Sequence, residues 1–237
     1  MPVSVPLLWV AGLFGGLIFW ALIVRRFLQR QGSSRRAASG KPHERVLLPT
    51  VREFWKHVTK SKSVFSRSFY AILFFVGIGS FLVHEFAHWV TGVALGHDMA
   101  ASPNHVWPRD TVSIIDQGLI SAAGPLVTVV QGLAGFLAVR RGRSHLGFAL
   151  LYMAFFMRLL AAGMSVFNPN DEARVSQLLG LGAWTLPLIV VGGLFILVLA
   201  ASRKLKLGFR EHVFCYLVAS VAVTLIVGMD MAFWRRA

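Results

Sequence analysis

Long apolar stretches, separated by short polar or basic connections, dominate this chain. An apolar stretch of about 20 residues is long enough to cross a bilayer as an α-helix. Six stretches approach or exceed this length, over residues 5–24, 69–95, 112–139, 146–166, 184–201 and 212–233. The pattern predicts an all-α fold: a polytopic helical membrane protein with about six transmembrane helices.

The connections between these stretches suggest four parts. Residues 1–24 read as a retained signal-anchor helix, because the apolar run is too long for a cleaved signal and Arg25 follows it directly. Residues 25–67 form a basic segment, residues 68–182 a core of three spans, and residues 183–237 two C-terminal transmembrane helices. Residues 97–111 are expected to form a loop.

The charge distribution supports a membrane protein over a nucleic-acid-binding one. The formal net charge is +14, but 56% of the residues are hydrophobic and only 14% are charged. Segments 25–67, 139–145 and 202–211 carry twelve, three and four of the 24 Lys and Arg residues. Basic loops of this kind face the cytoplasm and attract anionic lipids. We therefore expect cytoplasmic basic loops, extracytoplasmic termini, a prokaryotic plasma (inner) membrane and no nucleic-acid partner.

The second stretch contains the sequence His84-Glu85-Phe86-Ala87-His88, an HExxH motif. Histidines four residues apart lie on one face of a helix and can bind one Zn²⁺, and the glutamate can act as general base on an activated water. Ionisable groups are costly in hydrocarbon and persist there mainly for a function. The alternative is a polar patch between helices without a metal.

Zinc requires a third protein ligand, and the topology selects the candidates. The second and fourth stretches end on the same side of the membrane, so residues 168–172 should lie near the histidines. Asp171 is the first choice for the third ligand, and Glu172 is the runner-up. Both acids could also cap a following helix. His97 and Asp98, about two turns past His88, are rival ligands.

Other polar or flexible positions lie within the predicted spans. Pro125 follows Gly124 in the third stretch and frees a backbone carbonyl, which predicts a kink and close helix packing. The functional alternative is that this segment packs against the HExxH helix and shapes a substrate groove. Arg158 lies in the fourth stretch, and an ion pair with Asp116 is plausible. Arg158 would then fix helix packing or, alternatively, tune the acidic site.

Together, HExxH in one span, Gly124-Pro125 in the next and Asn168-Pro-Asn-Asp171 after the third resemble the site-2 protease family of intramembrane zinc metalloproteases. The resemblance covers roughly residues 69–180. It implies a three-helix catalytic core in which His84, His88 and Asp171 bind one zinc per chain. It also implies that Glu85 is the catalytic base and that Asn168 helps to hold the substrate carbonyl. The chain has Glu172 where that family usually has glycine.

The expected function is hydrolysis of peptide bonds in or near transmembrane segments of membrane-protein substrates. Two alternatives stay open: a non-proteolytic metal-binding protein, such as a transporter or sensor, and an inactive protease-like scaffold. Only the protease requires Glu85. The positive-inside rule places the site toward the extracytoplasmic face, whereas in well-known family members it lies nearer the cytosol. The sequence does not indicate the substrate or the oligomeric state.

Overall fold

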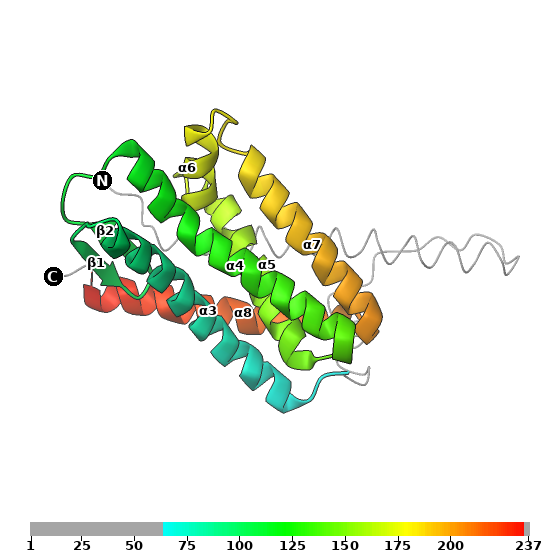
Figure 1. Cartoon of the computed structure of the whole chain (residues 1–237). Helices are drawn as coiled ribbons and strands as arrows, with labels where there is room; N and C mark the ends of the chain where they lie inside the picture. Colours follow the sequence, from blue (N-terminus) through cyan, green and yellow to red (C-terminus); the bar gives the residue numbers. More distant parts are fainter. Residues whose placement is uncertain (1–63, 235–237) are drawn as a thin grey trace, which may run out of the picture. The chain divides into compact units, whose positions relative to one another are not determined.

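A computed structural model describes residues 64–234 of the chain. Within them lie six α-helices, a two-stranded antiparallel hairpin and a C-terminal π-helical turn (Figure 1). The elements, in order, are α3 (Arg67–Ala94), β1 (Met99–Ser102), β2 (His105–Pro108), α4 (Ile114–Gly142), α5 (His145–Met164), α6 (Asp171–Leu178), α7 (Thr185–Leu205), α8 (Phe209–Met229) and η1 (Asp230–Trp234). The predicted all-α class is confirmed. The expected first span, residues 5–24, lies outside the described residues.

Short polar side chains set where the helices begin. Ser66, Ser113 and Ser144 precede α3, α4 and α5, and each hydroxyl accepts a hydrogen bond from a backbone N–H of the first turn. Asn170 does the same for α6. Such caps satisfy donors that a helix start otherwise leaves unpaired. The polar residues of the connections therefore determine where these helices begin.

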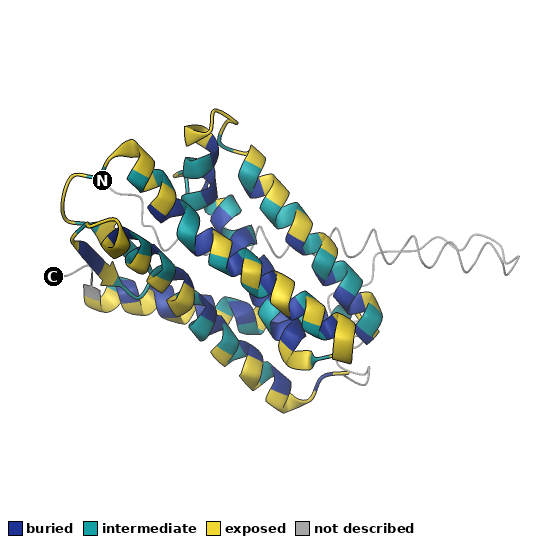
Figure 2. Cartoon of the chain, viewed as in Figure 1, coloured by how far each residue is buried: buried dark blue, intermediate teal, exposed yellow. Residues whose placement is uncertain are grey.

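Five of the described helices are long and apolar enough to span a membrane: α3, α4, α5, α7 and α8 with its π-helical extension. Large apolar side chains such as Phe75, Phe86 and Ile196 are more than 60% exposed. Exposed residues recur along each of these helices (Figure 2). Exposed apolar area on this scale is unfavourable in water and suits contact with lipid chains. The chain is a multi-pass membrane protein.

Helix α5 is the centre of the bundle. It packs against α3, α4, α6, α7 and α8. About two thirds of the residues in its most apolar part are buried, against 28% of those in the corresponding part of α7. Gly135 and Gly147 let the backbones of α4 and α5 approach closely, since a Cβ on Gly135 would lie 2.5 Å from the Gly147 carbonyl oxygen. Arg158, in the second half of α5, is therefore enclosed by the other helices.

The basic connections meet at one end of the bundle. Arg143, between α4 and α5, donates to the Lys204 carbonyl near the end of α7, and Lys204 donates to the Arg140 carbonyl. The Val64 amide, just before α3, donates to Glu211 in the first turn of α8. The hairpin and α6 lie at the opposite end (Figure 1). Two of the three basic segments predicted to share one side, residues 139–145 and 202–211, therefore lie together, and residues 25–63 of the third lie outside the described residues.

The predicted loop of residues 97–111 connects α3 to α4, and it also contains the hairpin of β1 and β2. Met99 pairs with Pro108 and Ser102 with His105 across a two-residue turn. Met99 also packs against Gly92, one helical turn beyond His88. The hairpin therefore lies against the histidine-bearing face of α3.

Candidate metal centre

Helix α3 presents two buried histidines side by side. His84 and His88 are 4% and 7% exposed, and their ring centroids lie 4.7 Å apart with the rings nearly perpendicular. They are one turn apart on a helix that is otherwise strongly apolar, in the half nearer to the hairpin. The predicted pairing of these side chains on one face is confirmed.

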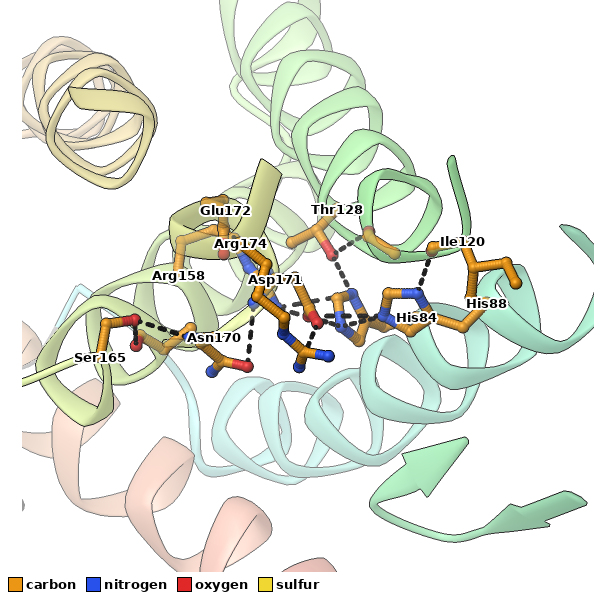
Figure 3. A network of polar contacts seen from close by, with 12 residues as sticks. His84, His88, Ile120, Thr128, Arg158, Ser165, Asn170, Asp171, Glu172 and Arg174 are labelled. Carbon is orange, nitrogen blue, oxygen red and sulfur yellow. Dashed lines mark hydrogen bonds and ion pairs between the residues drawn. The ribbon is translucent and has the colours of Figure 1, made fainter. Parts of the chain in front are cut away.

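Asp171 completes a three-residue cluster from a distant part of the chain (Figure 3). One carboxylate oxygen, Oδ2, lies 3.3 Å from His84 Nε2 and 3.4 Å from His88 Nε2. The two Nε2 atoms lie 3.2 Å apart. The three atoms thus form a nearly equilateral triangle.

The size of this triangle matches a tetrahedral zinc site. With bonds of about 2.0–2.1 Å to nitrogen and oxygen, a regular tetrahedron has edges of about 3.3–3.4 Å. The observed separations of 3.2–3.4 Å fall at this value. His84, His88 and Asp171 can therefore supply three of four ligands without rearrangement, and the fourth position is left for water or substrate.

Helix α4 orients both imidazole rings through hydrogen bonds to their outer nitrogens. His88 Nδ1 donates to the Ile120 carbonyl at 2.6 Å. Thr128 Oγ1 donates to the Gly124 carbonyl, so at 3.0 Å it accepts from His84 Nδ1. With the proton on Nδ1, each Nε2 keeps its lone pair for a metal.

Gly124 allows α4 to come this close. A Cβ at this position would lie 2.3 Å from His88 Nε2 and 2.4 Å from His84 Cε1. Any side chain would therefore overlap both imidazoles. The Gly124-Pro125 segment does pack against the HExxH helix, as one of the two sequence interpretations held, while α4 continues through Pro125 as a single helix.

The first turn of α6 positions Asp171. Asn170 caps the helix by accepting from the Asp171 amide, and the Asn170 amide donates to Ser165 Oγ at the end of α5. Arg174, one turn later, donates to the other carboxylate oxygen, Oδ1, at 3.3 Å. Oδ2 is therefore the oxygen directed at the histidines. Helix capping and a ligand-like position coexist in this residue.

Glu85 and Asn168 occupy different surroundings. Glu85 is half-buried and directly follows His84 on α3. Asn168 is exposed in the turn between α5 and α6. The structure therefore places Glu85 next to the cluster, whereas the role of Asn168 stays a prediction.

The remaining candidate ligands lie elsewhere. Glu172, the runner-up, is buried and pairs with Arg158 at 2.9 Å. Among the described residues, the group that could hold a metal ion consists of His84, His88 and Asp171. It does not include Glu172, His97 or Asp98. Asp98 lies 3.8 Å from Arg109 on the surface. Arg158 therefore pairs with Glu172 and not, as the sequence suggested, with Asp116.

His97 forms a second acid–histidine group at the same end of the bundle. Its Nδ1 lies 2.8 Å from Asp110 Oδ2, and its Nε2 lies 3.4 Å from Asp116 Oδ2. The hydrogen bond to Asp110 raises the pKa of His97 above its usual value and lowers the pKa of Asp110. This group ties the two ends of the α3–α4 connection together.

Sequence reasoning missed Thr128 and Arg174. Thr128 is an ordinary β-branched residue in an apolar run, and its importance follows only from the contact between α3 and α4. Arg174 lies three residues after Asp171, and this spacing could have suggested the contact.

Comparisons with protein-family models, with curated proteins and with solved structures return no match. What this site does must therefore be inferred from its own geometry.

Proposed function

We propose that this protein is an intramembrane zinc-dependent endopeptidase that hydrolyses peptide bonds in or near transmembrane segments. The observation that carries the proposal is the triangle of His84 Nε2, His88 Nε2 and Asp171 Oδ2, whose edges of 3.2–3.4 Å suit tetrahedral zinc. Two of its three residues, His84 and His88, lie on the spanning helix α3, and Glu85 follows His84 directly on that helix.

The donor set fits zinc better than the hard cations. Two imidazoles and one carboxylate are typical of catalytic zinc sites, whereas Mg²⁺ and Ca²⁺ prefer sites built from oxygen ligands. When bound, zinc would act as a Lewis acid that polarises the scissile carbonyl and activates water. His84, His88 and Asp171 would hold it.

The remaining chemistry belongs to the side chains of this chain. Glu85 takes a proton from the attacking water and transfers it to the leaving amine, a role that requires a carboxylate beside the ligands. Asn168, in the turn before α6, is proposed to hold the substrate carbonyl. The substrate segment is extended or locally unwound at the cleavage point, because an intact helix shields its carbonyls.

We further propose that the basic connections contact anionic lipids on the cytoplasmic side of a prokaryotic inner membrane. This follows from the positive-inside rule and from the meeting of Arg143 and Lys204 at one end of the bundle. His84 and His88 lie in the opposite half of α3, so the site would open toward the extracytoplasmic side.

The test is to compare host membranes that contain wild-type protein with membranes that contain Glu85→Gln. New peptide N-termini are labelled and mapped by mass spectrometry. We expect termini within or next to spanning segments that disappear in Glu85→Gln, because loss of a general base lowers turnover by about 10²–10⁴-fold. Zinc content should stay unchanged in this variant. Identical termini in both samples would contradict the protease and favour a transporter, a sensor or an inactive scaffold.

A further inference from the structure

A buried ion pair connects α5 to the first turn of α6, beside the metal centre. Arg158 and Glu172 are 3% and 6% exposed, and Arg158 Nη1 donates to Glu172 Oε1 at 2.9 Å. Burial of two charges inside a bundle is expensive, and such a pair is often replaceable by apolar residues without loss of stability. Its burial beside the metal centre therefore calls for a role beyond stability.

The guanidinium of Arg158 contacts the metal centre as well as Glu172. Its other terminal nitrogen, Nη2, lies 3.4 Å from both ring nitrogens of His84 (Figure 3). His84 Nδ1 already donates to Thr128, so Nε2 is the ring nitrogen that can accept a hydrogen bond from Arg158 Nη2. Arg158 thus contacts both His84, one of the three candidate metal ligands, and Glu172, the residue that follows Asp171.

The order of Asp171 and Glu172 in the chain gives this contact its consequence. Both residues lie in the first turn of α6, where successive side chains point about 100° apart. Asp171 is directed at the histidines of α3, and Glu172 is directed at Arg158 of α5. Holding both side chains fixes the rotation of this turn about its own axis.

The pair also balances charge close to the cluster. A lone guanidinium 3.4 Å from His84 would repel a divalent cation bound by the same ring. The carboxylate of Glu172 neutralises that charge at 2.9 Å. Arg158 and Glu172 together therefore leave the site attractive to a metal while they hold its geometry.

We propose that Arg158 and Glu172 are positioning residues that orient Asp171 toward His84 and His88 and thereby raise the metal affinity of the site. This inference rests on the metal centre of the proposed function. The residue that the sequence offered as a substitute for Asp171 instead supports it from the neighbouring position.

The experiment measures folding and metal binding separately in Arg158→Met, Glu172→Met and the double variant. Thermal stability is measured in detergent with a chelator present, so that bound metal does not contribute. Zn²⁺ affinity is measured by competition with a chromogenic chelator, and the geometry of the site is followed by the visible absorption of Co²⁺ in its place.

We expect each single variant to lose stability, because it leaves one buried charge unpaired, and the double variant to recover most of it. Zn²⁺ affinity should nevertheless stay about 10- to 100-fold below wild type in the double variant, as expected when groups that orient ligands are removed. The Co²⁺ spectrum should change as well. A double variant with wild-type affinity and spectrum would overturn the proposal and leave the pair a structural one.

Glu211→Met is the matched control. Glu211 is also a buried acid, 3% exposed, in the first turn of a helix, but it lies at the opposite end of the bundle and binds backbone amides. It should lose stability without any change in Zn²⁺ affinity. If the double variant fails to fold, Arg158→Lys keeps the charge but loses the planar fork. An unchanged affinity in Arg158→Lys would then overturn the proposal, and a lowered affinity would support it.

Failure of this inference is distinct from failure of the proposed function. If folded wild-type protein binds no zinc, both fail. If wild type binds zinc and cleaves its substrates while the double variant binds zinc equally well, only the positioning role fails. If the double variant loses affinity but wild type cleaves nothing, the positioning role holds for a metal site without protease activity.

Discussion

Two acids in first helical turns, the buried Glu211 and the largely enclosed Asp171, lie at opposite ends of the bundle and use their carboxylates differently. Glu211 accepts hydrogen bonds from the backbone amides of Val64 and Gly208, so its carboxylate closes a connection and caps a helix. Asp171, at the other end, directs Oδ2 at two imidazole nitrogens that could equally serve a metal. Burial alone does not indicate function. What distinguishes Asp171 is that its carboxylate and two imidazole nitrogens converge on one point.

The largest effect on the metal-site end is expected from filling the space beside Gly124. In Gly124→Ala, the new methyl group would overlap His88 Nε2 and His84 Cε1. We expect Zn²⁺ affinity to fall by about 100-fold or more, at or beyond the upper range for changes around a metal site. Chelator competition measures it. Gly79→Ala on α3 is the control, since its Cβ would meet nothing within 4 Å. Normal binding in Gly124→Ala would show that α4 does not approach the histidines.

A smaller effect is expected from Thr128→Val, which keeps the side-chain shape but removes the acceptor for His84 Nδ1. Zn²⁺ affinity should fall by about 10- to 100-fold, because the ring loses its fixed tautomer and orientation. Ser202→Ala is the matched control, since this buried hydroxyl makes a similar bond to the carbonyl four residues earlier. Equal losses in both variants would point to general loosening of the bundle.

The structural role of Glu211, at the other end of the bundle, is tested by Glu211→Gln. One of the two backbone amides that donate to Glu211, those of Val64 and Gly208, loses its acceptor. The free energy of unfolding should therefore fall by about 1–3 kcal/mol. Thermal or denaturant unfolding in detergent measures this. The zinc content should remain that of wild type. Loss of zinc from this variant would mean that the two ends are coupled and that the contrast between them fails.

His97 provides the smallest test, because it is a histidine between carboxylates at the metal-site end but outside the triad. Its hydrogen bond to Asp110 raises its pKa, so protonated His97 is favoured in the folded state. Its stabilising effect should be complete below the unfolded pKa of about 6.5 and be lost as pH rises through the folded pKa. NMR titration of His97 should show a lower pKa in Asp110→Asn. Added zinc should leave the titration unchanged, and a zinc-dependent shift would place His97 in the metal group.

The sequence was sufficient to predict the features that depend on the length of the apolar runs and on the spacing of residues along a helix. Apolar runs set the five described spans, and the four-residue spacing placed His84 and His88 on one face. Topology then brought Asp171 to the same end, and the structure places it against both rings. These predictions succeeded because each depends on local geometry or on which end of the bundle a connection reaches.

The features that were missed depend on contacts between elements. The hairpin turn at Pro103-Asn104 lacks the Asn-Gly or Gly-rich pattern that marks tight hairpins, so the sequence predicts a loop without strands there. The sequence makes a pair of Arg158 with Asp116 plausible without requiring it, because depth along a helix does not determine which neighbour a side chain faces. Its actual partner, Glu172, follows Asp171 directly, and only the packing of α6 against α5 distinguishes the two acids.

The central claim is that His84, His88 and Asp171 bind one metal ion together. The most direct test is the zinc content of detergent-purified protein after zinc supply and removal of the excess, measured for wild type, His88→Ala, Asp171→Ala and the control Glu211→Gln. The account predicts about one zinc per chain in wild type and in the control. It predicts loss of zinc in the other two variants. Folded wild type without zinc, or Asp171→Ala with full zinc, would contradict it.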